Sequence, residues 1–296
     1  MTIKPLHLLF PQWQGSGPNN ALFHAAHALA DACPGIQFTP VQVPETESLD
    51  VVNGVLGYNG ILSRMTVAAD MVSREAPDVI LTIGGDCGIE PVPVSWLNRK
   101  HDGNFTLVWL DAHADLNTPE TSPSGCYHGM PLATLMGLGD PDICSTCAST
   151  LRPDQIILAG LRDLDPAEAH IIEKENITRV NASDMAADDT LLAEAILKKG
   201  NHPVYIHIDL DVLDPNAYPY VRHPEPGGLT PEALQRTLAA IRQDCTVAGL
   251  GLMEFSLEPY TRMSTGVGGL QGDRDEKGLE TVIAILDGFG GILRTA

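Results

Sequence analysis

Short apolar segments alternate with longer amphipathic segments along this chain of 296 residues. The apolar segments are rich in Val, Ile and Leu, and they are Leu6–Phe10, Val79–Ile83, Thr106–Leu110, Gln155–Ala159, Val204–Ile208 and Ala248–Met253. Such runs are typical of parallel strands that are buried on both faces. Between them lie segments with a helical pattern: Asn19–Cys33, Ile61–Arg74, Pro166–Glu175, Thr190–Lys199, Pro231–Gln243 and Lys277–Gly288. The alternation predicts a three-layer α/β fold around a central, mostly parallel sheet.

The chain has no internal repeat, low-complexity tract or linker rich in Ser and Gly. We therefore expect residues 1–296 to form a single domain. Thr230 and Pro231 form a typical helix start, with a capping hydroxyl followed by proline at the first helical position. Stretches rich in Gly and Pro follow the predicted strands directly. Because an open α/β sheet binds its ligand at the carboxyl ends of its strands, residues in these stretches are the candidates for function.

The charge of the chain restricts its partners. There are 38 Asp and Glu against 18 Lys and Arg, a formal net charge of −20. Nucleic acids and anionic membranes require a basic surface, so we expect neither as a partner. No apolar run approaches the ~20 residues that span a bilayer, and the N-terminal segment lacks the form of a signal peptide. We therefore expect a cytoplasmic protein. Its six cysteines are too few and too irregular for a disulfide scaffold.

Two groups of possible metal ligands follow predicted strands. Asp111, His113 and Asp115 come directly after one strand, and their two-residue spacing puts them on one face of an extended chain. Asp209 and Asp211 follow another strand with the same spacing. Either group alone could be a solvated strand end. Together they favour a metal centre, because closely spaced acidic groups repel one another unless a cation neutralises them. Carboxylate and imidazole ligands suit Mn, Fe, Co or Zn, and shared carboxylates suit two ions.

Seven segments of the chain resemble motifs of the arginase/agmatinase (ureohydrolase) family, and they occur in the family's order. They are GGDC (84–87), DAHADLN (111–117), SGCYHGMP (124–131), GLRDLD (160–165), HIDLDVLDP (207–215), GGLT (227–230) and LME (252–254). The resemblance implies a single α/β domain with two Mn²⁺ ions. It also implies hydrolysis of the guanidinium group of a small cationic substrate, and a homotrimer or homohexamer.

The resemblance also implies a set of metal ligands. Asp111 and Asp209 would bridge the two ions, Asp115 would complete the shell of the first ion, and His113 and Asp211 would complete that of the second. A hydroxide between the ions would attack the guanidinium carbon, since two cations lower the pKa of bound water. Asp115 would also hold the proton of this hydroxide.

Further residues are implied to act on the substrate. Glu254 would pair with the cationic guanidinium head, a charge-assisted contact that is often bidentate. His128 would carry a proton to the leaving amine, for which the pKa of imidazole is suited. At the other end of the substrate, family positions that bind an α-carboxylate and an α-amino group correspond here to Asn117, Ser124, Asp165 and Glu168. These four residues favour an amino-acid substrate over a decarboxylated amine.

The chain departs from the family at the first metal ligand, where Cys87 replaces a histidine. A thiolate is a soft ligand that favours Zn or Fe over Mn, so divalent metals other than Mn²⁺ are possible. The added negative charge also makes a bridging water less acidic. Three interpretations follow: Cys87 is a ligand in a working two-metal centre, its position is weakly occupied, or the protein is catalytically silent.

The predicted pocket differs as well. Cys126 replaces a polar residue, and a stretch that includes Arg222 and His223 replaces small residues. These two side chains could bring positive charge or bulk to the site, or could point to solvent. The cysteine exchange resembles the branch that hydrolyses N-omega-hydroxy-L-arginine. We therefore expect an amidinohydrolase for L-arginine or such a derivative, releasing urea or hydroxyurea and an ornithine-type amine. The alternatives are a ureohydrolase for agmatine or formiminoglutamate and a silent arginase-fold protein.

Overall fold

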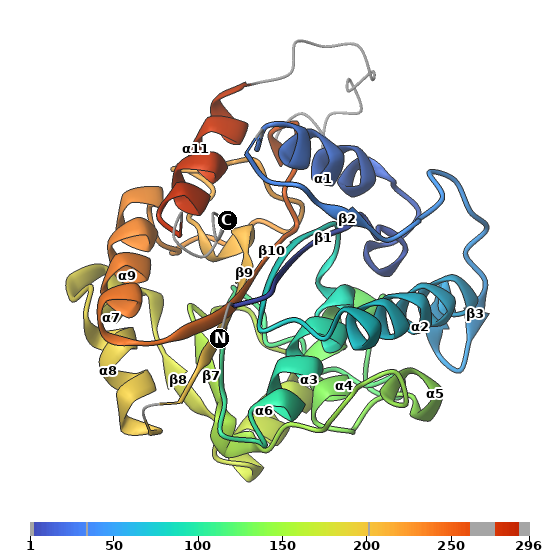
Figure 1. Cartoon of the computed structure of the whole chain (residues 1–296), viewed down its shortest axis with the longest axis horizontal. Coiled ribbons are helices and arrows are strands. Elements are labelled where there is room, and N and C mark those ends of the chain that lie inside the picture. The colour runs from blue at the N-terminus through green and yellow to red at the C-terminus, as the bar shows by residue number, and fades with distance from the viewer. Residues whose placement is uncertain (1–2, 34, 201, 261–275, 290–296) are drawn as a thin grey trace.

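The computed structural model describes residues 3–33, 35–200, 202–260 and 276–289 (Figure 1). Within these ranges, eight strands form one sheet in the order β2–β1–β5–β10–β9–β6–β7–β8. Their bounds are β1 Pro5–Phe10, β2 Thr39–Pro40, β5 Val79–Gly84, β6 Thr106–Leu110, β7 Ile156–Ala159, β8 Thr178–Val180, β9 Val204–Asp209 and β10 Val247–Met253. All neighbouring strands of this sheet run parallel. The predicted parallel sheet and its six predicted strands are confirmed.

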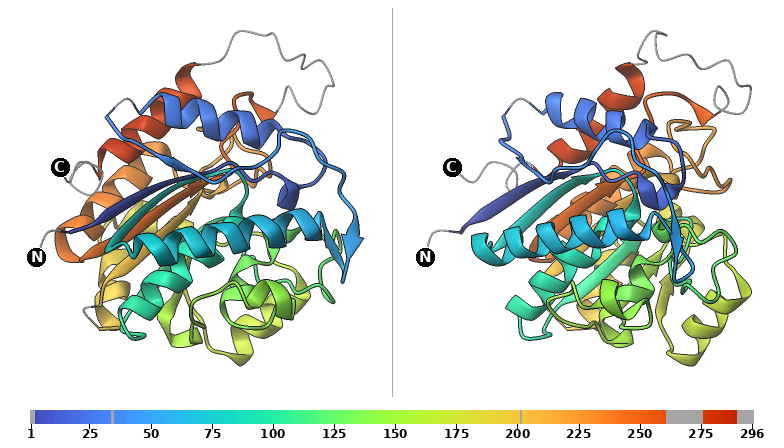
Figure 2. Two further views of the ribbon diagram at one scale, coloured as in Figure 1. Left: turned by 45° about the vertical axis from the view of Figure 1, so that its right-hand side comes forward. Right: turned by 90° about the vertical axis from the view of Figure 1, so that its right-hand side faces the viewer.

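Helices cover both faces of the sheet, as Figures 1 and 2 show. One face packs against α1 (Ala21–Asp31), α7 (Ala182–Ala187), α8 (Leu191–Lys198), α9 (Pro231–Asp244) and α11 (Glu276–Asp287). The other packs against α2 (Tyr58–Glu75), α3 (Pro91–Lys100), α4 (Pro131–Leu135), α5 (Pro141–Cys144) and α6 (Pro166–Lys174). The fold is thus the predicted three-layer α/β arrangement. A short antiparallel pair, β3 (Val51–Val52) and β4 (Val55–Leu56), lies outside the main sheet.

The central strands are largely apolar because each of their faces packs into its own core. In β6, Leu107 and Trp109 pack into the core under α2 and α3, whereas Val108 and Leu110 pack into the core under α8 and α9. Successive side chains of a strand point to opposite faces, so every residue of the sequence TLVWL after Thr106 is apolar. The same alternation in β9 directs Tyr205 into the core under α2 and α3.

Local signals fix several helix starts. The Thr230 hydroxyl accepts a hydrogen bond from the Ala233 N–H at 3.2 Å, and Pro231 is the first residue of α9, as predicted. The helices α3, α4, α5 and α7 were not predicted. Three of them begin at a proline, which occupies the first turn of a helix without losing a backbone hydrogen bond. In the part of the chain that the structure describes, no helix has the length and apolarity needed to cross a membrane.

Candidate metal centre

The predicted site residues gather at the carboxyl ends of four adjacent strands. Cys87 follows β5, Asp111 follows β6, Asp209 is the last residue of β9, and Glu254 directly follows β10. Because β5, β10, β9 and β6 are neighbours in the sheet, their ends form one edge. The position agrees with the rule that open α/β sheets bind ligands at the carboxyl ends of the strands.

Two groups of potential ligand atoms share one carboxylate, Asp111. The inner group consists of Cys87, Asp111, Asp115 and His207, and the outer group consists of Asp111, His113 and Asp211. Within each group, all the ligand atoms lie within 4.8 Å of one another. Asp209 contacts the inner group, because its Oδ2 lies 3.1 Å from the Cys87 Sγ. The two groups and Asp209 together contain all six predicted metal ligands.

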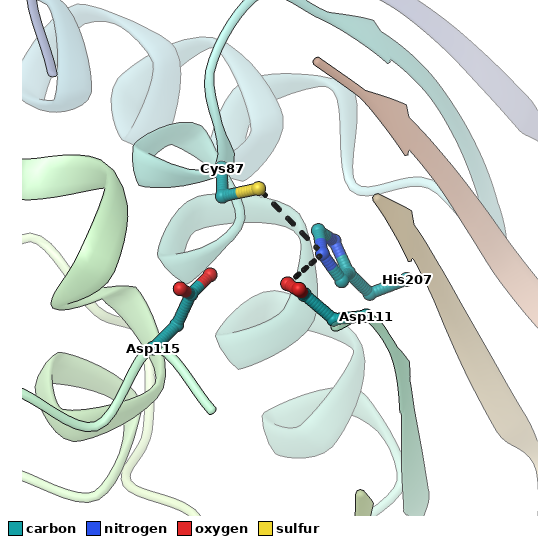
Figure 3. A group of neighbouring side chains, drawn as sticks. All are labelled: Cys87, Asp111, Asp115 and His207. Carbon is teal, nitrogen blue, oxygen red and sulfur yellow. Dashed lines mark hydrogen bonds and ion pairs between the residues drawn. The ribbon is translucent and has the colours of Figure 1, made fainter. Parts of the chain in front are cut away.

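The inner group, whose four side chains are drawn in Figure 3, is buried. Its four residues are at most 5 % exposed. The Nε2 of His207 lies 3.7 Å from the Sγ of Cys87 and 3.7 Å from Oδ2 of Asp111. Asp115 faces them, and its Oδ2 is buried without a hydrogen-bond partner among the residues that the structure describes. This oxygen is available to a ligand.

The outer group borders the solvent. The Nδ1 of His113 lies 3.0 Å from Oδ2 of Asp211 and 3.4 Å from Oδ1 of Asp111. The His113 side chain is 27 % exposed, whereas Asp111 and Asp211 are buried. The second oxygen of Asp211 accepts a hydrogen bond from the Ala112 N–H at 3.0 Å. Backbone donors thus orient one oxygen of the carboxylate and leave the other for His113.

The two groups and Asp209 contain several buried acidic side chains that repel one another. Burial and the neighbouring Asp111 carboxylate hold the pKa of Asp115 well above its usual range. Burial and Asp211 do the same for the pKa of Asp209, and burial together with Asp111 raises the pKa of Asp211 to about 6. The Cys87 thiol also has a raised pKa, through burial and the charge of Asp209. Acidic groups packed so closely need cations in order to remain ionised.

Backbone geometry at two of the site residues is unusual. Asp115 has φ +52° and Glu254 has φ +59°, a left-handed conformation that non-glycine residues seldom adopt. Local hydrogen bonds hold both: the Asp115 carbonyl accepts from the Leu132 N–H at 3.0 Å, and the Glu254 N–H donates to the Gly85 carbonyl at 2.8 Å. Such conformations concentrate at functional sites, where the surrounding structure enforces them.

The residues present fit two divalent cations. The inner group offers sulfur, nitrogen and oxygen donors around the unpaired Asp115 oxygen, and the outer group offers one imidazole between two carboxylates. Donor sets of this composition are those of first-row transition metals. The cations would also relieve the repulsion that raises the pKa of Asp115 and Asp209.

A pocket of about 300 Å³ opens above the two groups. Its lining includes His113, Asp115, Asp209 and Asp211 from the metal-ligand candidates. All four residues predicted at the far end of the substrate also line it, namely Asn117, Ser124, Asp165 and Glu168. The structure thus brings four of the six predicted ligands and the predicted far-end residues to one cavity, whereas Cys87 and Asp111 are not part of its lining.

The far-end residues are already hydrogen-bonded to one another and to the backbone. The Asn117 amide donates to Oδ2 of Asp165 at 2.8 Å. Glu168 accepts from the Leu116 N–H at 2.9 Å and the Asp165 N–H at 3.0 Å, so it also caps the start of α6. Burial, opposed by these two bonds, raises the pKa of Glu168. Ser124 lies on the rim, where its hydroxyl accepts from the Cys126 N–H at 3.2 Å.

Glu254 and His128 form a pair beside the metal-ligand candidates. The Nδ1 of His128 lies 3.7 Å from Oε1 of Glu254, which also accepts a hydrogen bond from the Ser16 hydroxyl at 2.9 Å. The other oxygen of Glu254 is buried with no hydrogen-bond partner in the described ranges. Burial opposes protonation of His128, but the Glu254 carboxylate and the charge of Asp86 together raise the pKa of the imidazole. Ser16 was not predicted, since it stands in no motif and reaches Glu254 across 238 positions.

Of the altered residues, His223 and Cys126 line the pocket and Arg222 does not. The His223 ring lies 4.8 Å from the His128 ring, between centroids. Burial and the neighbouring His128 lower the pKa of His223 to about 4, so its imidazole is neutral. His223 therefore contributes bulk and a hydrogen-bonding group to the pocket. Asp214 belongs to neither metal-ligand group; its carboxylate accepts a hydrogen bond from the Asn216 N–H at 2.9 Å and caps the following turn.

Sequence comparisons agree on one family. The model of the arginase family matches residues 22–265. An arginase of Staphylococcus aureus is 35% identical over 216 residues, which cover 69% of this chain and 70% of that protein. An arginase of Bacillus caldovelox is 36% identical over 156 residues, about half of each chain (51% and 52%).

The fold is that of solved arginases. The structure of Entamoeba histolytica arginase in complex with L-ornithine superposes with a TM-score of 0.84, covering 98% of this chain and all (100%) of the other. The identity between the two is 22%, so this likeness concerns the fold.

Proposed function

This chain belongs to the arginase family and is a metal-dependent amidinohydrolase, and we propose that its substrate is L-arginine or a close derivative such as N-omega-hydroxy-L-arginine. The products are urea or hydroxyurea and an ornithine-type amine. The observation that carries the proposal is the position of two adjoining metal-ligand groups at the floor of a polar pocket, with the Glu254 and His128 pair beside them.

Family membership implies a binuclear divalent-metal centre, and we assign its ions to the inner and outer groups. Cys87, Asp111, Asp115 and Asp209 would hold the inner ion; Asp111, Asp209, His113 and Asp211 would hold the outer one. We propose Mn²⁺, with other divalent transition metals admitted by the thiolate of Cys87. When bound, the two ions lower the pKa of a shared water molecule and make it a nucleophile near neutral pH.

Glu254 is suited to the cationic head of the substrate. Its Oε2 is buried and unpaired within the described part of the chain, while its Oε1 is fixed by Ser16 and His128. A guanidinium supplies the donor that this oxygen lacks, in a charge-assisted hydrogen bond. Since the carboxylate cannot rotate freely, the bond fixes the reacting carbon above the two metal-ligand groups.

Two residues handle protons. The Oδ2 of Asp115 is unpaired in the described structure, and Asp115 belongs to the inner group and lines the pocket, so it is placed to take up a proton from the attacking water. His128 holds a proton through its contact with Glu254, because that carboxylate raises the pKa of the imidazole. The imidazolium donates this proton to the nitrogen of the leaving amine.

The far end of the pocket suits an amino acid. Asn117 and Ser124 offer neutral donors to a carboxylate, whereas Asp165 and Glu168 bring negative charge opposite an amino group. An amine such as agmatine would use only the second pair. This distribution supports a substrate that keeps both its α-amino group and its α-carboxylate.

His223 supports the hydroxylated derivative. Its Nε2 is buried, and no partner for it occurs among the described residues. With its pKa lowered to about 4, the neutral ring adds no charge that would repel a guanidinium, and it can hydrogen-bond to a hydroxyl group. A hydroxyguanidine is also less basic than a guanidine, so its neutral form is more accessible to a centre whose thiolate weakens the metals as Lewis acids.

The test compares products from three substrates. Protein loaded with Mn²⁺, Co²⁺ or Zn²⁺ is incubated with arginine, N-omega-hydroxyarginine and agmatine, and urea, hydroxyurea and amine are quantified. We expect hydrolysis of the two amino acids, with the larger kcat/KM for hydroxyarginine. Release of urea from arginine far faster than release of hydroxyurea from hydroxyarginine would contradict the hydroxyarginine assignment. A fully metal-loaded protein that cleaves none of the three would indicate a silent member of the family.

We also propose a homotrimer or homohexamer, which the relationship to the arginase family supports. Light scattering of the purified protein tests this directly. A mass of three or six chains is expected, and a monomer or dimer at micromolar concentration would exclude it.

A further inference from the structure

His207 lies in the middle of the sheet with its ring held on three sides. It is fully buried, and its ring stacks on Trp109 with 3.6 Å between centroids and 18° between planes. Its Nδ1 lies 3.0 Å from Oε1 of Glu90. Glu90 is fixed in turn, since its Oε2 accepts a hydrogen bond from the Tyr205 hydroxyl at 2.7 Å. One ring nitrogen is therefore committed to a buried carboxylate, and the other is aimed elsewhere.

That other nitrogen points into the inner group (Figure 3). The Nε2 of His207 is 3.7 Å from the Cys87 Sγ and 3.7 Å from Oδ2 of Asp111. The separation from Asp111 is long for a hydrogen bond to a carboxylate, whereas the separation from Cys87 is ordinary for a contact with sulfur. They match the edges of a tetrahedral shell, in which metal–sulfur bonds of about 2.3 Å and metal–nitrogen bonds of about 2.0–2.1 Å separate the ligand atoms by about 3.5 Å.

We propose that His207 is a direct ligand of the inner ion, which it binds through Nε2 in addition to the ligands Cys87, Asp111, Asp115 and Asp209 already assigned to that ion. The assignment rests on the proposed function, which places an ion in the inner group. It also gives a reason for the tolerance of cysteine at position 87: the imidazole absent from the end of β5 is supplied by β9.

The surroundings of His207 are those of a metal-binding imidazole. Histidines that bind metals generally donate their second ring N–H to a carboxylate, which fixes the tautomer and increases the basicity of the ligating nitrogen. Glu90 is that carboxylate here, and it has no exposure to solvent that would weaken its effect. One thiolate, one imidazole and carboxylates form a donor set that favours Zn²⁺ or Co²⁺ over Mn²⁺.

The first test uses Co²⁺, whose thiolate charge-transfer absorption reports only on the ion that Cys87 binds. The variant His207→Asn keeps a donor near the Nδ1 position for Glu90 and removes the nitrogen that faces Cys87. We expect this variant to bind that Co²⁺ ion about 100-fold more weakly, at the upper end of the loss seen when only a supporting residue is removed. The control Tyr205→Phe alters the other oxygen of Glu90 and is expected to keep the absorption band. Unchanged affinity and an unchanged spectrum in His207→Asn would overturn the proposal.

The second test needs no variant and so survives a failure of His207→Asn to fold. In a crystal structure of the wild-type protein loaded with Zn²⁺, the His207 Nε2 should lie about 2.0–2.1 Å from the ion that Cys87 binds. A nitrogen more than about 3 Å from that ion would refute the assignment. Hydrolysis assays on the same preparation separate the two proposals: His207 bound to the ion in an inactive protein refutes the proposed function alone, and an active protein with His207 off the ion refutes this inference alone.

Discussion

The inner and outer groups share Asp111 but differ in almost every other respect. The outer group reaches the solvent through its member His113, whose side chain is 27 % exposed and lines the pocket. The inner group contains the sulfur of Cys87 and is at most 5 % exposed. Oxygen and nitrogen donors near solvent suit a readily exchanged, harder ion, whereas a buried thiolate suits a softer and more slowly exchanged one. Two ions in one centre can therefore differ in identity and affinity, although they share a carboxylate.

The largest expected effect is that of a change common to both groups. Asp111→Asn removes one of the two carboxylates assigned to both ions, so both ions should be lost and kcat/KM should fall by about 10³-fold or more, since metal ions contribute several kcal/mol to such reactions. Metal analysis and steady-state kinetics measure the two losses. Asp184→Asn, at an exposed position of α7, is the matched control and should change neither. An Asp111→Asn enzyme with two ions and near-normal activity would contradict the shared role.

A change in the inner group alone should separate the ions. Cys87→Ser removes the soft ligand, so the inner group should bind Zn²⁺ or Co²⁺ about 10- to 100-fold more weakly, while the outer ion is retained. His113→Asn should have the opposite selectivity. Chelator competition with metal analysis gives both affinities. Equal losses of the two ions in Cys87→Ser would show that the groups are not independent.

A second variant at this position tests the metal preference. Cys87→His should raise the occupancy of the inner group by Mn²⁺; unchanged occupancy would mean that the thiolate does not set the metal preference.

Glu254 lies outside the inner and outer groups, and its replacement should leave both ions in place. Glu254→Gln removes a charge-assisted contact worth about 1.5–3 kcal/mol, so kcat/KM should fall roughly 10- to 100-fold with unchanged metal content. A loss of metal instead would move Glu254 into the metal centre.

The same variant tests the pH behaviour of His128. Burial lowers the pKa of this imidazole, and the contact with Glu254, together with the charge of Asp86, raises it above its usual value. Without the carboxylate, burial prevails, so His128 should lose its proton at lower pH than in the wild-type protein. Histidine resonances followed by NMR across a pH titration give the direction directly. A pKa that rises or stays constant in Glu254→Gln would contradict the pairing of His128 with Glu254.

The smallest effect is expected away from both groups, at Asp140. Its carboxylate accepts from the Asp142 and Ile143 N–H groups and caps α5, so Asp140→Ala should cost about 1 kcal/mol of stability with normal activity. Burial raises the pKa of Asp140, but these hydrogen bonds outweigh it and hold the pKa below its usual value. The stabilisation is therefore present above a pH of about 4 and is lost on further acidification. Denaturant unfolding at pH 7 and pH 3 should show the smaller difference between wild type and variant at pH 3.

The sequence predicted the parts of the molecule that depend on local pattern. The strands before Cys87, Asp111 and Asp209 are apolar on both faces, and their order along the chain could be read directly. The convergence of the ligands followed from a general property of parallel sheets, whose carboxyl ends share one edge. Strands β2 and β8 were missed because they have only two and three residues at the margins of the sheet.

Features that depend on distant partners could not be predicted. His207 stands in an apolar strand, and its sequence neighbours give no sign of the Glu90 carboxylate 117 positions away. Glu168 was predicted to face the substrate, but its hydrogen bonds to the Leu116 and Asp165 N–H groups depend on the packing of α6. His223 was recognised as unusual, yet its neutral state follows from burial and from the nearby His128.

The most direct test of the two-group account is a metal titration of the metal-free protein with hydrolysis measured at every step. Mn²⁺ or Co²⁺ is added in known equivalents while urea and hydroxyurea release is followed from arginine and N-omega-hydroxyarginine. The account predicts two bound ions per chain of unequal affinity and activity that appears only as the second ion binds. Full activity after one equivalent, or in the absence of bound metal, would contradict it.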